Sequence, residues 1–146
     1  MTGRLIFVTL LSFVVSLGLP QFAFAADTSA IPGHQRLVLQ VSDRDTGTWN
    51  QALNVARNVQ QEFGAKNVEI ELVVYGLGIG MLKMESVVGT RIADAMAAGV
   101  KVVACTNTMT AQKLTQQDML PNIGYVKTGV VELMQRQQQG WTYIRP

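Results

Sequence analysis

Cysteine and histidine are almost missing from this chain of 146 residues, which contains one of each, Cys105 and His34. A single cysteine excludes a disulfide bond within the chain. One cysteine and one histidine are also too few for a typical four-ligand zinc site. Because His34 precedes the first predicted strand, a Cys-His or Ser-His catalytic pair is disfavoured as well. We therefore expect no metal site.

Charge is scarce and balanced, with 12 Lys and Arg against 10 Asp and Glu, and 15% charged residues in total. The sequence has no block of Lys or Arg, no internal repeat and no low-complexity tract. Nucleic acid is therefore not an expected partner. The sequence also lacks a second apolar run that is long enough to span a membrane.

The one long apolar run lies at the N-terminus and has the pattern of a secretory signal peptide. Arg4 supplies a positive charge, Leu5 to Leu19 is apolar, Pro20 interrupts it, and Ala23-Phe24-Ala25 forms a small-x-small cleavage site. An uncleaved anchor is the alternative, disfavoured because the segment is short and no charged stop-transfer flank follows. We expect residues 1–25 to be removed, leaving an exported protein without a stable membrane anchor. In a Gram-negative source, its location would be the periplasm.

The remaining 121 residues have a net charge near +1, because the predicted signal peptide contains one basic residue. Residues 26–35 are predicted to be a flexible leader, and residues 36–146 a single α/β domain. Apolar and β-branched runs predict strands at 37–41, 68–75, 100–104, 125–126 and 141–144. Apolar stripes with a helical period predict helices at 49–63, 86–98, 108–117 and 129–139.

Strands that alternate with single helices predict a doubly wound, mostly parallel sheet of about five strands with helices on both faces. Thr48 and Gln51 form a capping box for the first helix, and Thr128 is expected to cap the last. The loops 42–47, 76–83 and 105–110 follow strands, so we expect all three at the carboxyl edge of the sheet. Cys105 should then lie near the glycine-rich loop.

The glycine-rich loop contains Gly76, Gly78 and Gly80 at a spacing that differs from the dinucleotide-binding pattern. No acidic residue closes the next strand, so we expect no nucleotide cofactor and, more generally, no cofactor. A tight turn with positive φ angles is one interpretation. The alternative is a loop that contacts an anion or substrate, with Lys83 close by.

The segment Asp43-Arg44-Asp45-Thr46 follows the first strand and has the Asp-x-Asp spacing of haloacid-dehalogenase-type phosphotransferases. Those enzymes need further lysine and carboxylate groups to hold Mg²⁺ and phosphate. The later strand ends provide a cysteine and glycines instead. We therefore interpret this segment as a solvated turn.

Cys105 ends an apolar strand and opens a polar segment, Thr106 to Thr110. Amides at the start of a helix stabilise a thiolate, so such a position favours a reactive thiol. An inert, buried cysteine at a strand end is equally compatible with the pattern. Both interpretations stay open on these residues alone.

Several segments together carry a resemblance to a known family. They are Trp49 to Asn54, Val68 to Ile70, Tyr75 to Leu82, Gly99 to Lys101, Ala104 to Met109, Leu120 to Val126, Gly129 to Glu132 and Gly140 to Ile144. On these segments, Leu37 to Pro146 resembles the DsrE/DsrF-like family of sulfur-relay proteins, especially its small exported members. The most specific segment is Cys105-x-Asn107-Thr108-Met109.

The resemblance implies a flavodoxin-like fold and a homo-oligomer, a trimer or hexamer. It also implies that Cys105 carries sulfur as a persulfide between a donor and an acceptor, each a protein or a small molecule. The supporting roles follow from position in the sequence and not from the resemblance. Asn107 and Thr108 are expected to orient the sulfur, and Lys83 or Lys113 to favour the thiolate. Gly76 and Gly78 belong to the loop that is expected to contact a substrate if it is not only a tight turn. Some relatives have a second cysteine where this chain has Thr108, so internal disulfide exchange is excluded here.

Three functions from different classes remain open at this stage. The first is an exported sulfur carrier or sulfur-transfer protein that uses Cys105. The second is a non-enzymatic oligomeric module that binds a ligand or protein and has a structural cysteine. The third is a redox-sensing thiol that pairs between chains.

Overall fold

The structure is a computed structural model that describes residues 33–146. The predicted signal peptide and most of the predicted leader lie outside the described residues. None of the described helices combines the length and the apolar character needed to cross a lipid bilayer.

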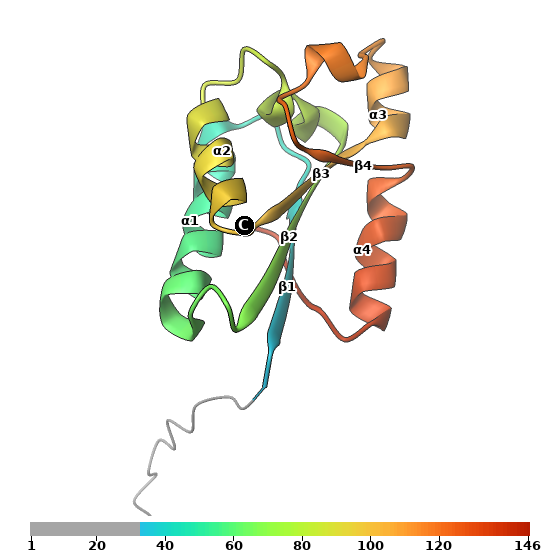
Figure 1. The fold of residues 1–146 in the computed structure, drawn as a ribbon. Coiled ribbons are helices and arrows are strands. Elements are labelled where there is room, and N and C mark those ends of the chain that lie inside the picture. The colour runs from blue at the N-terminus through green and yellow to red at the C-terminus, as the bar shows by residue number, and fades with distance from the viewer. Residues whose placement is uncertain (1–32) are drawn as a thin grey trace, which may run out of the picture. The chain divides into compact units, whose positions relative to one another are not determined.

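A five-stranded parallel sheet forms the centre of the domain (Figure 1). Its spatial order is β4-β3-β2-β1-β5, so the strand order reverses between β1 and β5. The strands are β1 (Gln35–Val41), β2 (Val68–Val74), β3 (Lys101–Cys105), β4 (Gly124–Val126) and β5 (Thr142–Ile144). The predicted α/β class, with about five mostly parallel strands, is confirmed. β1 begins one residue before the predicted domain boundary.

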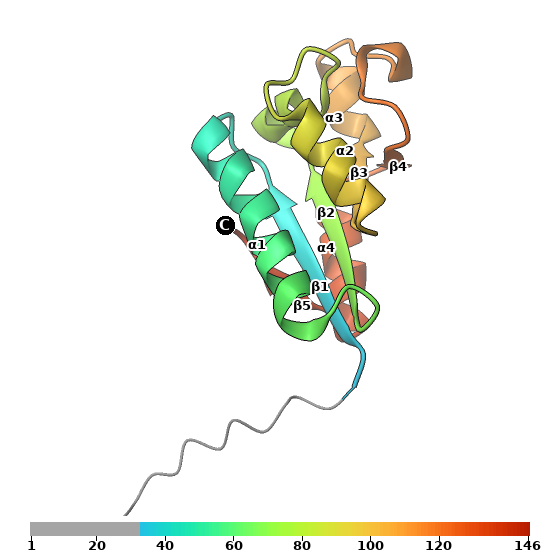
Figure 2. The same ribbon diagram turned by 60° about the vertical axis from the view of Figure 1, so that its left-hand side comes forward.

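Helices cover both faces of this sheet, as predicted. Figure 1 shows α1 and α2 on one face and α4 on the other, with α3 above the carboxyl ends of the strands. The view in Figure 2 shows β1 and β2 running side by side towards the end of the domain that carries α3. The helices are α1 (Thr46–Phe63), α2 (Gly89–Ala97), α3 (Thr106–Ala111) and α4 (Gly129–Gln138), with 3-10 turns η1 (Gly76–Leu82) and η2 (Gln116–Asp118).

The main core lies between the sheet and the pair α1 and α2. Side chains alternate along a strand, so Val68, Ile70, Leu72 and Val74 of β2 all face this core. Trp49 and Ile92 bring the helices onto it. Burial of these apolar side chains is the main stabilising contribution to the fold.

The opposite face carries a smaller core and a buried ion pair beneath α4. Glu71 is fully buried, and its carboxylate lies 2.6 Å from Arg136 Nη2 and 3.2 Å from Lys101 Nζ. Burial, together with the nearby Glu132 carboxyl, raises the pKa of Glu71 despite the two cations. Arg136 also lies over the ring of Trp141, 4.8 Å from its centroid. These contacts attach α4 to β2 and β3.

The start of α1 differs from the sequence prediction. The N-cap is Asp45, whose carboxylate accepts a hydrogen bond of 2.7 Å from the Thr48 amide. The predicted capping box of Thr48 and Gln51 is therefore wrong. The physical reason is that Asp45 is a strong N-cap residue in its own right. In addition, Trp49 Nε1 donates to the carbonyl of Asp43 at 2.7 Å, which holds the preceding turn in place.

Two further elements correct the sequence prediction. The glycine-rich segment Gly76–Leu82 forms the 3-10 turn η1, and of its three glycines only Gly76 has the positive φ angle expected for a tight turn. Thr128 is the N-cap residue of α4, but its side chain makes no capping hydrogen bond. Its hydroxyl oxygen instead accepts a hydrogen bond from Asn107 Nδ2 at 3.1 Å. The second difference follows from a contact between segments that are distant in the sequence.

Candidate functional site

Cys105 is the last residue of β3 and the N-cap residue of α3. Its side chain is buried, with 4% of the residue exposed. Cys105 pairs with Val126 of β4, so the segment that follows β4 passes directly beside the sulfur. The starts of α3 and α4 therefore meet at Cys105.

The surroundings of the sulfur favour the thiolate. Burial is the largest single influence and raises the pKa of Cys105, because it disfavours the charged form. Hydrogen bonds from the Thr108 hydroxyl and from the amides of Gly129, Thr108 and Asn107 act in the opposite direction. Together they outweigh burial, so the pKa of Cys105 is lowered. A lowered pKa increases the fraction of thiolate, which is the nucleophilic form of cysteine.

Thr108 connects the cysteine to the glycine-rich segment. Its Oγ1 accepts a hydrogen bond of 3.0 Å from the Gly76 amide, and the hydroxyl can donate in turn to the sulfur. Gln112 Nε2 donates to the Gly76 carbonyl at 3.1 Å, which fixes the same residue from α3. The prediction that Cys105 lies near this segment is confirmed.

The carbonyl of Lys127 lies on the other side of the sulfur. It is 3.7 Å from the Cys105 thiol and accepts a hydrogen bond of 3.1 Å from the Asn107 amide. A protonated thiol can donate to this carbonyl, whereas a thiolate accepts from the amides and the Thr108 hydroxyl. The two protonation states of Cys105 thus have different hydrogen-bond partners.

Four of the predicted supporting residues take separate roles in the structure. The Asn107 amide donates to the Lys127 carbonyl and lowers the pKa of Cys105, whereas its side chain holds Thr128. Gly76 has a φ angle of 56° and acts on the cysteine through Thr108. A Cβ atom on Gly78 would lie 2.7 Å from the Val41 carbonyl oxygen, so Gly78 permits close backbone packing. Lys83 Nζ pairs with Glu85 at 2.5 Å, and it is not one of the groups that shift the pKa of Cys105.

Two residues of this region were not among the site residues predicted from the sequence. Gly129 contributes an amide to the sulfur from the first position of α4. Tyr75 follows β2, and its ring packs against Gly129 so closely that a Cβ atom there would lie 3.0 Å from Tyr75 Cβ. The sequence marks Gly129 as a helix start, but the pairing of β3 with β4 places it beside Cys105.

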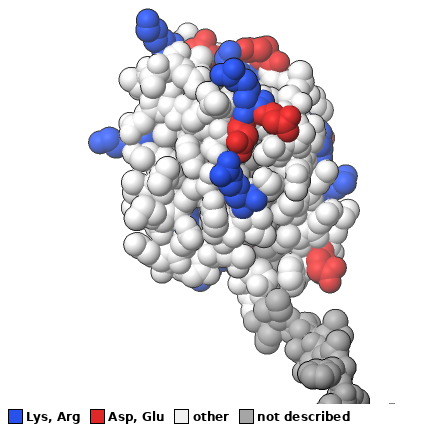
Figure 3. Space-filling view, turned by 180° about the vertical axis from the view of Figure 1, so that it is seen from behind, with Lys and Arg blue, Asp and Glu red and all other residues white. Residues whose placement is uncertain are grey.

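Charged side chains are sparse on one face of the domain. Figure 3 shows one face of the domain, on which Lys, Arg, Asp and Glu side chains are few and include one compact group of both signs. Leu77 in η1 and Val130 in α4, neighbours of the site-forming Gly76 and Gly129, are 55% and 47% exposed. Within residues 33–146, no group of three or more His, Cys, Asp and Glu side chains could hold a metal ion.

Comparisons with known proteins agree with this architecture. Residues 37–146 match the model of the DsrE/DsrF-like family. The solved structure of MTH1491 from Methanobacterium thermoautotrophicum is 29% identical in sequence, with a TM-score of 0.73 over 77% of this chain and 99% of that chain. No curated protein matches this chain.

Two more distant structures share the fold. BT1422 from Bacteroides thetaiotaomicron is 15% identical, with a TM-score of 0.62 over 77% of this chain and 95% of that one. The ychN protein from E. coli is 12% identical, with a TM-score of 0.61 over 77% of this chain and 99% of that one.

Proposed function

The chain belongs to the DsrE/DsrF-like family, and on that premise we propose that it is a sulfur carrier that holds a persulfide on Cys105. The observation that carries this proposal is the set of hydrogen-bond donors around the sulfur. The Thr108 hydroxyl and three backbone amides lower the pKa of a thiol whose burial would otherwise raise it. A cysteine that serves only to fill space needs no such donors.

The proposed reaction is an exchange at sulfur. The Cys105 thiolate attacks the outer sulfur of a donor persulfide, R-S-SH, and forms a new S–S bond. The S–S bond of the donor breaks, and the donor leaves as the thiolate R-S⁻. Cys105 then carries the group as Cys105-S-SH, and an acceptor thiolate removes the outer sulfur by the same exchange.

Mass measurement tests this function directly. The protein is incubated with an inorganic polysulfide, and its intact mass is recorded with Cys105→Ala as the control. We expect gains in steps of about 32 Da that a reductant reverses and that are absent from the variant. An unchanged mass in the unsubstituted protein, with a thiol that reacts only after unfolding, would exclude a persulfide carrier.

A second candidate function is an oligomeric binding module with a structural cysteine. The 4% exposure of Cys105 favours it, as do the exposed apolar side chains on α4, Val130, Val131 and Met134. Under this proposal, α4 contacts another copy of the chain and Cys105 supports the packing at the sheet edge. Slow reaction of the native thiol with thiol reagents, and a loss of oligomer when Met134 is replaced by Glu, would favour this candidate.

A third candidate is a redox-sensing thiol that forms a disulfide with Cys105 of a second chain. The lowered pKa of Cys105 supports it, whereas the low exposure disfavours it. Electrophoresis without reductant separates the two species, and an absence of covalent dimer after oxidation would exclude this candidate.

We further propose that the protein is exported after removal of residues 1–25 and that it forms a homo-oligomer. The N-terminal pattern supports export, and the exposed apolar side chains of α4 support self-association. Sequencing the N-terminus of the secreted or periplasmic protein tests the first point, since Met1 there would contradict cleavage. Native mass spectrometry tests the second.

A further inference from the structure

The reversal of strand order places a second group of polar residues at the carboxyl edge of the sheet. β1 lies between β2 and β5 in the sheet, although β5 is the last strand in the sequence. In parallel sheets, the segments that leave the carboxyl ends diverge at such a reversal, and ligands commonly bind there. The proposed chemistry at Cys105, which ends β3, makes no use of this region.

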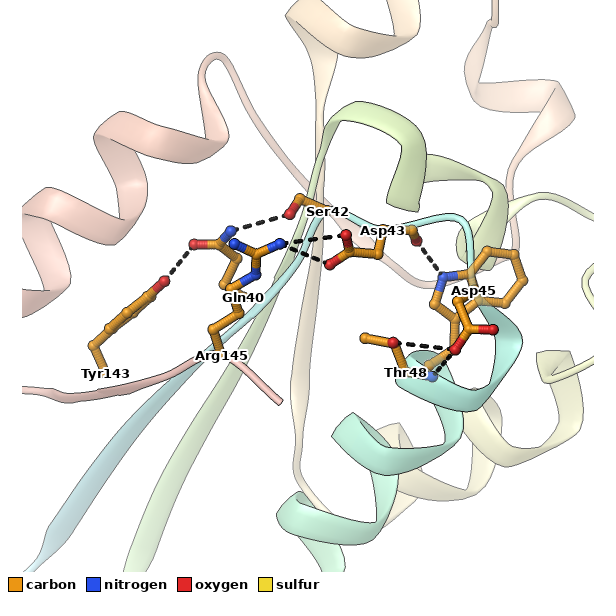
Figure 4. A network of polar contacts seen from close by, with 8 residues as sticks. Gln40, Ser42, Asp43, Asp45, Thr48, Tyr143 and Arg145 are labelled. Atoms are coloured by element: carbon orange, nitrogen blue, oxygen red, sulfur yellow. Dashed lines mark hydrogen bonds and ion pairs between the residues drawn. The ribbon is translucent and has the colours of Figure 1, made fainter.

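Side chains from β1 and β5 meet at this point in a fixed arrangement (Figure 4). The Tyr143 hydroxyl donates to Gln40 Oε1 at 2.5 Å, and Gln40 Nε2 lies 3.1 Å from the Ser42 hydroxyl. Gln40 is 8% exposed and is one of two buried polar residues among residues 33–146. The polar groups are thus held in place before any ligand arrives, which lowers the entropic cost of binding.

Arg145 gives this region a positively charged donor. One of its terminal nitrogens, Nη2, contacts the Asp43 carboxylate at 3.0 and 3.3 Å, which orients the guanidinium. The Arg145 side chain is 53% exposed. A guanidinium has five N–H donors, so the donors of Arg145 that do not face Asp43 are available to a carboxylate.

Tyr75 connects this polar region to Cys105. Burial raises the pKa of Tyr75, as does the neighbouring Tyr143, whereas the Ser42 hydroxyl and Arg145 lower it. The Tyr75 amide donates to the Val41 carbonyl at 3.1 Å, which places Tyr75 beside Ser42 at the end of β1. Its ring packs on Gly129, whose amide contacts the sulfur. β2 lies between β3 and β1 in the sheet, so Tyr75 lies between Cys105 and the β1–β5 region.

The distance between Cys105 and Arg145 determines which ligands are long enough to contact both residues. Cys105 and Arg145 follow β3 and β5, which are three strand spacings apart, or about 14 Å. An extended peptide advances about 3.3–3.6 Å per residue, so three or four residues span that distance. Inorganic sulfide and polysulfide ions are too short to contact both ends.

We propose that the edge from Cys105 to Arg145 binds a small acidic peptide persulfide as the sulfur donor. Its persulfide lies at Cys105, and its carboxylate pairs with Arg145. Tyr75 and the Ser42 hydroxyl line the path between them. The inference rests on the proposed function, and it adds the chemical class of the donor. The Cys105 thiolate attacks the outer sulfur, the S–S bond of the donor breaks, and the peptide leaves as its thiolate.

Sulfur loading of Cys105 is compared for two donors, glutathione persulfide and inorganic polysulfide, in the unsubstituted protein and in Arg145→Gln. We expect KM for glutathione persulfide to rise about tenfold in the variant, because a charge-assisted contact is lost, while loading by inorganic polysulfide is unchanged. Arg57→Gln on α1 is the matched control, and Arg145→Lys should restore part of the effect. An equal KM for glutathione persulfide in Arg145→Gln and the unsubstituted protein would overturn the inference. An equal loss of Cys105 loading with both donors in Arg145→Gln would also overturn it.

Binding of S-methylglutathione, which cannot transfer sulfur, separates this inference from the proposed function. We expect saturable binding that Arg145→Gln weakens about tenfold. Binding of this kind without any loading of Cys105 would exclude the sulfur carrier but leave the peptide site standing. Loading by polysulfide without any binding of S-methylglutathione would leave the carrier standing and overturn the peptide site.

Discussion

Gly129 lies against Tyr75 so closely that a Cβ atom added to Gly129 would be 3.0 Å from both Cβ and Cδ1 of the tyrosine. Tyr75 is fixed at the end of β2, so the first turn of α4 can approach only because position 129 has no side chain. The same approach brings the Gly129 amide to the Cys105 sulfur. The packing of the Tyr75 ring and the stabilisation of the Cys105 thiolate therefore both depend on Gly129.

Replacing Gly129 by Ala should lower stability and raise the pKa of Cys105. The added methyl group pushes the start of α4 away from Tyr75, and overpacking of this kind costs about 1–3 kcal/mol in the free energy of unfolding. Urea unfolding and the pH dependence of thiol alkylation measure the two effects. Gly89→Ala is the control, since Gly89 also begins a helix but faces only the flexible end of Leu120 at 3.3 Å. A Gly129→Ala protein with unchanged stability and reactivity would contradict this account.

Replacing Thr108 by Val should raise the pKa of Cys105, because the thiolate loses the hydroxyl that donates to it. The alkylation rate then reaches its half-maximum at a higher pH. Thr110→Val is the control in the same helix, because the Thr110 hydroxyl bonds to the Thr106 carbonyl at 2.9 Å. An equal shift in both variants would point to a general disturbance of α3 and not to the Thr108 hydroxyl.

The buried Glu71 should give stability a specific pH dependence. Burial is the first cause of its raised pKa, and Glu132 is the second. A carboxyl whose pKa is higher in the folded than in the unfolded state favours folding at low pH. That contribution is lost as the pH rises from about 4.5 through the folded-state pKa.

The free energy of unfolding is measured between pH 4 and pH 8, a range of about four units around the carboxyl transition, for the unsubstituted protein and Glu71→Gln. We expect the stability of the unsubstituted protein to fall relative to Glu71→Gln as the pH rises. Glu62→Gln on the exposed side of α1 is the control. The difference in the free energy of unfolding between the two proteins could instead stay constant or change in the opposite direction with pH. Either result would show that Lys101 and Arg136 determine the pKa of Glu71.

Replacing Asp45 by Ala should reduce the free energy of unfolding by about 1 kcal/mol, because the Thr48 amide loses its capping partner. Thermal or urea unfolding measures the loss. Asp94→Ala is the control, since Asp94 is exposed within α2 and its side chain caps no helix. If Thr48→Ala costs more than Asp45→Ala, the cap has been assigned to the wrong residue.

Local patterns in the sequence were sufficient to predict the fold class, and they located Cys105 at a strand end. Runs of apolar and β-branched residues predict strands, and helical stripes ended by glycines predict helices, so these elements depend on near neighbours. The same reasoning predicted that loops leaving parallel strands share an edge, and Gly76 and Thr108 do meet there. The same reasoning wrongly assigned the N-cap of the first helix to Thr48, because the sequence alone makes both Thr48 and Asp45 acceptable N-cap residues.

The sequence by itself therefore determined the sheet, the helices and the position of the one cysteine, since backbone periodicity and burial are properties of each segment. Only the tertiary structure decided which strands are neighbours. The pairing of β3 with β4 brings Gly129 to Cys105, and the pairing of β1 with β5 brings Tyr143 to Gln40. The physical reason is that a hydrogen bond between residues far apart in the chain depends on the packing of the whole domain. Local residue propensities do not specify that packing.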